Sequence, residues 1–212
     1  MDQTSGTNKS GQVITFYSYK GGVGRSMALA NVACLLAQTG QKVLVVDWDL
    51  EAPGLHRFFR DQLTKHFGVS TVTEQMLDQQ PGLIDLFIEL DAATQRQGLP
   101  QTGQGADIAR EVINQIDFSK YLLKTNLATL TLLKAGRQDE GYGARITTFS
   151  WENLFNRSPY LYRSLAEHWA EEYQYVLIDS RTGETDTSCI CTMIMPEKLV
   201  AVFTTNRQSL IG

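Results

Sequence analysis

Short apolar runs bounded by polar residues or glycines recur along this chain. They lie at residues 13–17, 42–47, 175–179 and 198–203, and residues 127–133 show a looser alternation of Leu and Thr. Runs of this length, rich in Val and Ile, are typical of strands that are buried on both faces of a parallel sheet. The pattern therefore predicts four such strands and makes residues 127–133 a plausible fifth.

Between these runs, apolar residues recur at helical spacing. Residues 27–37 do so before a stop at Thr39-Gly40, and residues 160–172 do so before the run at 175–179. A strand, a helix and a second strand in succession form a right-handed βαβ unit with parallel strands. We therefore predict an α/β fold with a doubly wound, mostly parallel sheet, in which ligands bind outside the carboxyl ends of the strands.

The middle of the chain, about residues 62–115, is harder to interpret. Pro81-Gly82 precedes an apolar-periodic stretch at 83–90 that favours a helix, and residues 98–105 have the composition of a loop. Two interpretations stay open. The segment is a helical insertion over the ligand site, or it consists of ordinary crossover helices with a long loop.

Composition sets further limits. The chain has 212 residues, of which 42% are hydrophobic and 20% charged, and this suits one globular domain at residues 12–212 behind a flexible tail at residues 1–11. The sequence has no apolar run long enough to span a bilayer and no signal peptide, so we expect a cytoplasmic protein. The net charge of −4 gives no support for a nucleic-acid or membrane partner.

The three cysteines are too few for a disulfide framework. Cys34, Cys189 and Cys191 lie in segments that favour helices, so we expect reduced, buried thiols. Cys189 and Cys191 also leave open a different function, a scaffold for a metal cluster, although core packing explains them more simply. His56, His66 and His168 are too far apart in sequence to suggest metal ligands.

The chemistry is concentrated in the glycine-rich turn after the first strand, Tyr19-Lys20-Gly21-Gly22-Val23-Gly24-Arg25-Ser26. Glycines let consecutive backbone N–H groups surround a phosphate chain, because they have no side chain and accept positive φ. The helix that follows directs its positive N-terminus at the same phosphates, and the Ser26 hydroxyl is placed to bind Mg²⁺. The turn therefore predicts a nucleotide phosphate site.

At these residues the chain resembles the deviant Walker A ATPases, a family that includes ParA, MinD, the arsenical-pump ATPase and the nitrogenase iron protein. The resemblance implies that Lys20 is the signature lysine, which reaches the phosphates of the second subunit in a dimer that sandwiches two nucleotides. Two positions depart from the family motif. Tyr19 replaces its first glycine, and Arg25 replaces the lysine that contacts the β- and γ-phosphates. Arg keeps the charge but has a planar shape, so binding is a safer inference than fast turnover.

Two strand ends resemble other family segments. Asp47-Trp48-Asp49 follows the second strand, and the resemblance implies that Asp49 in switch I places the attacking water while Asp47 supports the metal shell; an ordinary Asp-rich turn is the alternative. Asp179 and Gly183 resemble Walker B and switch II, which implies an Mg²⁺-bound water at the carboxylate and a backbone N–H near the γ-phosphate.

Two further residues have open assignments. Asn206, in Thr204-Thr205-Asn206-Arg207, resembles the family's adenine-contacting Asn, or it is a turn former or helix cap. Arg181 in switch II is expected to be solvated, and a phosphate clamp is the alternative.

We therefore predict a ParA/MinD-like ATPase that binds ATP and Mg²⁺, forms an ATP-dependent homodimer and switches an unidentified effector protein or C-terminal domain. A nucleotide-sensing assembly module with little hydrolysis is the alternative. We also expect the sheet to be incomplete at residue 212, as in the N-terminal module of a longer protein. The residues expected to take part in catalysis are Lys20, Arg25 and Asp49. Those expected to hold the metal are Ser26, Asp47, Asp49 and Asp179. Those expected to bind nucleotide are Lys20, Gly21, Gly22, Val23, Gly24, Arg25, Ser26, Met27, Gly183 and Asn206.

Overall fold

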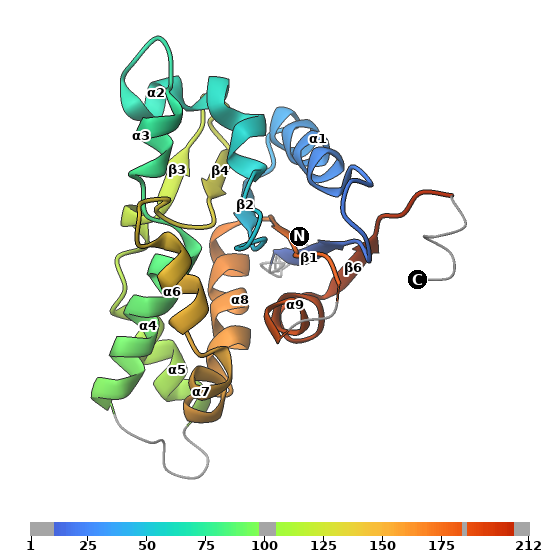
Figure 1. Cartoon of the computed structure of the whole chain (residues 1–212). Helices are drawn as coiled ribbons and strands as arrows, with labels where there is room; N and C mark the ends of the chain where they lie inside the picture. Colours follow the sequence, from blue (N-terminus) through green and yellow to red (C-terminus); the bar gives the residue numbers. More distant parts are fainter. Residues whose placement is uncertain (1–10, 98–104, 184–185, 206–212) are drawn as a thin grey trace, which may run out of the picture.

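The computed structural model describes residues 11–97, 105–183 and 186–205 (Figure 1). In these residues the strands form one sheet with the order β3-β4-β2-β5-β1-β6. The strands are β1 (Gln12–Tyr17), β2 (Val43–Asp47), β3 (Leu122–Lys124), β4 (Leu130–Leu133), β5 (Tyr175–Asp179) and β6 (Lys198–Ala201). Every neighbouring pair is parallel except β3 and β4, which are antiparallel. The predicted mostly parallel α/β sheet is confirmed.

Helices cover both faces of this sheet, as a doubly wound fold requires. One face carries α1 (Arg25–Gln38), the 3₁₀ helix η1 (Leu55–Leu63), α2 (Thr64–Phe67) and α3 (Glu74–Asp78). The other face carries α4 (Leu83–Gln97), α5 (Gly105–Asn114), α6 (Tyr142–Thr148), α7 (Trp151–Arg157), α8 (Leu161–Glu172) and α9 (Asp186–Cys189), which continues as the π-helix η3 (Ile190–Ile194). A short 3₁₀ helix, η2 (Phe118–Lys120), precedes β3.

The central strand β2 illustrates why its residues alternate between two cores. Val43 and Val45 pack with α1 and η1, whereas Leu44 and Val46 pack with the helices of the opposite face. All four side chains are fully buried. A strand that is covered on both sides has no polar face, and this explains its continuous apolar run.

The helices of residues 62–115 belong to both faces of the sheet, with α2 and α3 on one face and α4 and α5 on the other. Helices α4 and α5 pack against each other, α5 also packs against α8, and their apolar residues join the core of that face (Figure 1). No described residue of this segment lines the cavity that lies at the carboxyl ends of the strands. The described part of this segment therefore packs into the core and does not form the cavity wall, and its assignment as an insertion or as crossover helices stays a prediction.

A buried lysine joins β4 to the loop that leads into α4. The Lys134 Nζ atom donates to the carbonyl oxygens of Leu77, Gln80 and Gly136 at 2.8, 2.9 and 2.5 Å. Its side chain is fully buried, and burial lowers the pKa of Lys134 to about 8. The hydrogen bonds offset the cost of burying this amine.

The sheet ends at β6, whose four residues are all exposed. The observed strand ends at Ala201, so the predicted strand at 198–203 is two residues too long. Among the described residues no helix combines the length and the apolar character that crossing a bilayer demands.

Candidate nucleotide site

The turn between β1 and α1 depends on glycine. Gly22 and Gly24 have φ angles of 77° and 85°, a left-handed region that costs other residues strain. Gly24 is also the N-cap of α1, and its carbonyl oxygen accepts from the N–H of Ala28 at 2.9 Å. Helix α1 therefore begins at Arg25 with its positive end at the turn.

Three adjacent strands bring the other predicted residues to this turn. Asp47 and Asp179 are register partners at the ends of β2 and β5, and β5 lies directly between β2 and β1. Beyond the strands, the Trp48 N–H donates to the Asp179 carbonyl oxygen at 3.0 Å, and the Ser180 N–H donates to that of Phe16 at 3.1 Å. The backbone therefore fixes both aspartates beside the glycine turn.

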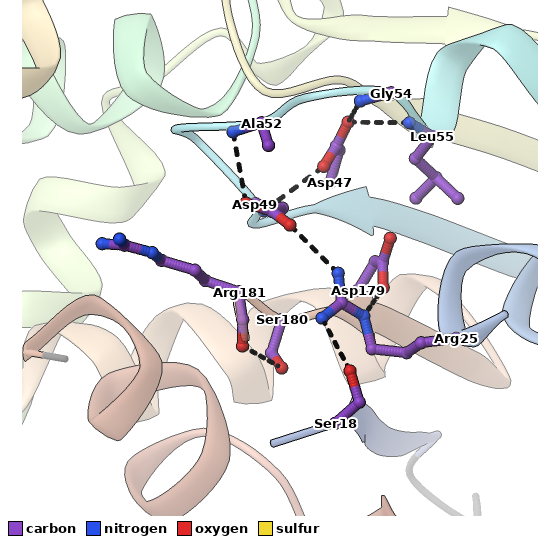
Figure 2. A network of polar contacts seen from close by, with 10 residues as sticks. All are labelled: Ser18, Arg25, Asp47, Asp49, Ala52, Gly54, Leu55, Asp179, Ser180 and Arg181. Atoms are coloured by element: carbon purple, nitrogen blue, oxygen red, sulfur yellow. Dashed lines mark hydrogen bonds and ion pairs between the residues drawn. The ribbon is translucent and has the colours of Figure 1, made fainter. Parts of the chain in front are cut away.

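Arg25 joins the site's carboxylates, as Figure 2 shows. Its Nε donates to Asp179 Oδ1 at 2.5 Å, and one terminal nitrogen donates to Asp49 Oδ2 at 3.1 Å. The other terminal nitrogen donates to Ser18 Oγ at 3.2 Å. The Arg25 side chain is only 6% exposed. Arg25 lies among the residues at this turn, and its charge is directed at two carboxylates.

Asp47 organises the loop that follows β2. Its Oδ2 atom accepts from the N–H groups of Gly54 and Leu55 at 3.3 and 3.1 Å, and its Oδ1 accepts from the N–H of Asp49 at 3.3 Å (Figure 2). Burial and the nearby Asp179 charge raise the pKa of Asp47 to about 8. Because both oxygens already accept backbone hydrogen bonds, Asp47 is better suited to hold the loop after β2 in place than to bind a metal directly.

Asp179 and Ser26 present oxygen atoms of the kind that Mg²⁺ prefers. The Ser26 side chain hydrogen-bonds to Asp179, so the hydroxyl and the carboxylate are neighbours. Burial raises the pKa of Asp179, and Arg25 and Ser26 oppose that effect. The donor chemistry and proximity of these two side chains fit a magnesium site.

The loops that follow β2 and β5 contact each other directly. Arg181 forms an ion pair with Glu51, which lies just after Asp49, and Ser180 Oγ donates to the Arg181 carbonyl oxygen at 3.1 Å. Tyr142 of α6 fixes the same loop by donating its hydroxyl hydrogen to the Leu50 carbonyl oxygen at 2.8 Å. Arg181 thus links the two loops, a contact that neither sequence interpretation included.

These segments surround one cavity of about 530 Å³, a size that suits a small-molecule ligand. The predicted residues that line it are Gly21, Gly22, Val23, Gly24, Arg25, Ser26, Met27, Asp47, Asp49 and Asp179. The lining residues that sequence analysis missed are Ser18, Ala52, Gly54, Arg57, Phe58 and Thr182. Lys20 and Gly183 are not among the lining residues. Gly183 has a positive φ of 77°. Asn206 lies outside the described residues.

The cysteines differ from the expectation of three buried thiols. Cys191 is buried, Cys34 is partly buried and Cys189 is exposed. The prediction was wrong for Cys189 because the helix that carries it turns this residue outward. Within residues 11–97, 105–183 and 186–205, no three His, Cys, Asp or Glu side chains form a group that could hold a metal ion.

Comparison with known proteins agrees with this geometry. A family model described as an AAA domain matches residues 11–212. No curated protein matches the chain in sequence. Many solved structures match its fold.

Three of these structures illustrate the similarity. A plasmid partition protein from Borrelia burgdorferi has a TM-score of 0.58 and 16% identity, with 96% of this chain and 69% of that chain covered. The septum site-determining protein MinD from Pyrococcus horikoshii, complexed with Mg-ADP, has a TM-score of 0.53 and 20% identity, with 94% and 60% covered. The kinase domain of the Escherichia coli tyrosine kinase ETK has a TM-score of 0.56 and 14% identity, with 96% and 60% covered. The chain thus spans about three fifths of the MinD and ETK chains.

Proposed function

We propose that this chain, which belongs to the AAA domain family and has the fold of the ParA/MinD-like P-loop ATPases, binds Mg-ATP and acts as an ATP-dependent switch. One observation carries the proposal. The glycine turn, the start of α1, Ser26 and the strand-end aspartates line a single cavity of about 530 Å³. This set combines backbone donors for phosphates with oxygen ligands for a hard cation.

Each group has a proposed role. The N–H groups of the turn and the α1 N-terminus bind the phosphate chain. Ser26 and Asp179 would hold Mg²⁺, which offsets charge on the β- and γ-phosphates when it is bound. Asp49 places the attacking water, and Asp47 supports it by fixing switch I.

Hydrolysis is proposed to be slow. Arg25 is held by Asp49 and Asp179, and those carboxylates must be released before they can act on water or on the metal. Only contacts that strengthen in the transition state lower the barrier, so a guanidinium that stays with Asp49 contributes little to it. The same observation favours a second candidate, an assembly module that binds ATP and hydrolyses very little.

Phosphate release separates these two functions. For the switch, single-turnover measurements should show release of one phosphate per bound ATP. Arg25→Lys should accelerate it, because a compact ammonium lacks the rigid planar fork that holds Asp49, Asp179 and Ser18 through three separate nitrogens. For the assembly module, ATP remains intact over the same period in the parent and in the variant.

The switch is proposed to involve a homodimer that sandwiches two nucleotides, with Lys20 reaching the partner's phosphates. The absence of Lys20 from the lining of its own cavity supports this role. Light scattering after size exclusion tests it: with ATP, Asp49→Ala should accumulate dimer and Lys20→Ala should not. Lys42→Ala, at an exposed lysine before β2, is the matched control. Parent-like behaviour of both variants would refute the sandwich dimer.

Thermal melting tests nucleotide binding itself. A ligand that binds only the native state stabilises it by mass action, by about 2.7 kcal/mol when its concentration is a hundred times Kd. We expect a clear rise in Tm with millimolar Mg-ATP. No rise in a folded sample contradicts the proposed function. The effector, an unidentified protein or C-terminal domain, and a cytoplasmic location are part of the same proposal.

A further inference from the structure

Arg57 is a second cation in the wall of the proposed nucleotide cavity. It lies on η1, a few residues after switch I, and it lines the cavity together with the glycine turn and Asp49. Its side chain is 66% exposed, in contrast to the buried Arg25. Among the described lining residues, Arg25 and Arg57 are the two that carry positive charge.

The two cations that line the cavity, Arg25 and Arg57, differ in their pairing with its carboxylates. Asp47, Asp49 and Asp179 line the cavity with the two arginines. Arg25 already forms ion pairs with Asp49 and Asp179, so its charge is offset within the protein. A triphosphate that enters brings several more negative charges, and Arg57 is not paired with any of the cavity's carboxylates.

Glu74 holds Arg57 from outside the cavity. The Arg57 Nε donates to Glu74 Oε1 at 3.2 Å, and Glu74 is not a lining residue. This contact uses Nε and therefore leaves both terminal nitrogens of Arg57 for an anion. A guanidinium oriented in this way can donate two parallel hydrogen bonds to phosphate oxygens.

Glu74 also lies close to Arg60 and His56. Arg60 Nη1 lies 3.8 Å from its Oε2, and His56 Nε2 lies 3.6 Å from its Oε1. Arg60 is 50% exposed, lies on the same helix η1 and does not line the cavity. Arg60 therefore shares the charge, the helix and the carboxylate partner of Arg57, but not its position.

We propose that Arg57, oriented by Glu74, binds the terminal phosphate of the nucleoside triphosphate and so lets the site distinguish a triphosphate from a diphosphate. The inference rests on the proposed function and adds a binding residue to it. The position of Arg57 after switch I favours the terminal phosphate, because Asp49 of that segment is proposed to act there. Glu74 is a positioning residue in this arrangement.

The test compares the affinities of the full chain and its variants for Mg-ATP and Mg-ADP by isothermal titration calorimetry. Arg57→Ala should weaken Mg-ATP binding about tenfold, the effect of losing a charge-assisted hydrogen bond, and should change Mg-ADP binding by less than about twofold. Arg57→Lys should recover part of the loss. Glu74→Gln should weaken Mg-ATP selectively but less than Arg57→Ala does. Arg60→Ala should match the parent for both nucleotides.

Two kinds of result would contradict the assignment of Arg57. Equal losses of Mg-ATP and Mg-ADP affinity in Arg57→Ala, or equal effects of Arg57→Ala and Arg60→Ala, overturn the assignment of Arg57 while the proposed function stands. If the folded parent binds neither nucleotide, the proposed function fails and this inference fails with it. Thermal melts without nucleotide show whether each variant is folded.

Discussion

Replacing Arg25 with methionine tests how far its ion pairs with Asp49 and Asp179 hold the site together. Methionine keeps a long unbranched side chain but removes the charge and all three hydrogen bonds, to Ser18, Asp49 and Asp179. The Asp179 side chain is only 2% exposed and that of Asp49 14%. Their charges would then lie next to each other without the cation that separates them.

The expected loss of stability is large. Removing one partner of a buried ion pair typically costs about 3–5 kcal/mol, because it leaves an uncompensated buried charge. Domains of this type are stable by only about 5–15 kcal/mol. We therefore expect Arg25→Met to lower the free energy of unfolding in urea by about 3–5 kcal/mol at neutral pH.

The loss should also depend on pH. Burial raises the pKa of Asp179 above its ordinary 3.8, and Arg25 opposes that rise. In the variant the pKa of Asp179 is therefore higher, and the native state binds more protons than the unfolded state above about pH 4. The stability of the variant relative to the parent should fall as the pH rises, and urea titrations from about pH 5 to pH 8 measure this slope.

Arg157→Met is the matched control. The Arg157 Nη1 atom lies 2.8 Å from Asp91 Oδ1, but both side chains are about one quarter exposed. Solvent screens such a pair, so its loss should cost at most about 1 kcal/mol. Equal losses in the two variants, or a loss in Arg25→Met that does not change with pH, would refute the idea that Arg25 compensates Asp179.

Three other predictions concern the fold. Lys134→Met should lower the free energy of unfolding in urea by about 2–4 kcal/mol, because it removes three hydrogen bonds to buried carbonyls. The pKa of Lys134 is lowered from 10.5 to about 8, so between these pH values the native state binds fewer protons than the unfolded state. The parent should therefore gain stability relative to the variant as the pH rises from about 8 to 10.5. Gly24→Ala should lower the Tm, because φ is 85° at this position. Gly143→Ala should raise the Tm, because Gly143 lies in α6 with an ordinary φ and open space around it. Scanning calorimetry of both variants measures these opposite changes in Tm. Cys189 should react with a thiol reagent in the native protein and Cys191 only after unfolding, because Cys191 is buried and burial raises its pKa; mass spectrometry of labelled peptides decides the matter.

Local features of the sequence predict the sheet and the glycine turn well. Periodicity identifies the apolar runs of β1, β2 and β5, and backbone conformation explains the glycines at 22 and 24. Neighbouring residues determine both of these features. By contrast, β3 has only three residues and forms an antiparallel pair with β4. Its pairing partner decides whether such a short segment is a strand, so the sequence pattern did not predict it.

The side-chain arrangement of the site could be predicted only in part. The sequence indicates that Arg25 lies at the phosphate turn, but its partner Asp179 is 154 positions away along the chain. The strand order decides which carboxylate meets it, and no local pattern encodes that order. Arg57 was missed for a similar reason: its partner Glu74 is 17 positions away along the chain and belongs to another helix.

The central position of β5 has a consequence for folding. The segment up to Asp47 contains the entire glycine motif together with β1 and β2, yet these two strands do not pair with each other, because β5 lies between them. A nascent chain that emerges from the ribosome only as far as α8 therefore carries the glycine motif without the strand that aligns it. Such long-range parallel pairing closes late and costs loop entropy. Nucleotide affinity should consequently appear in one step, when β5 enters the sheet, and not gradually as the amino-terminal half is synthesised.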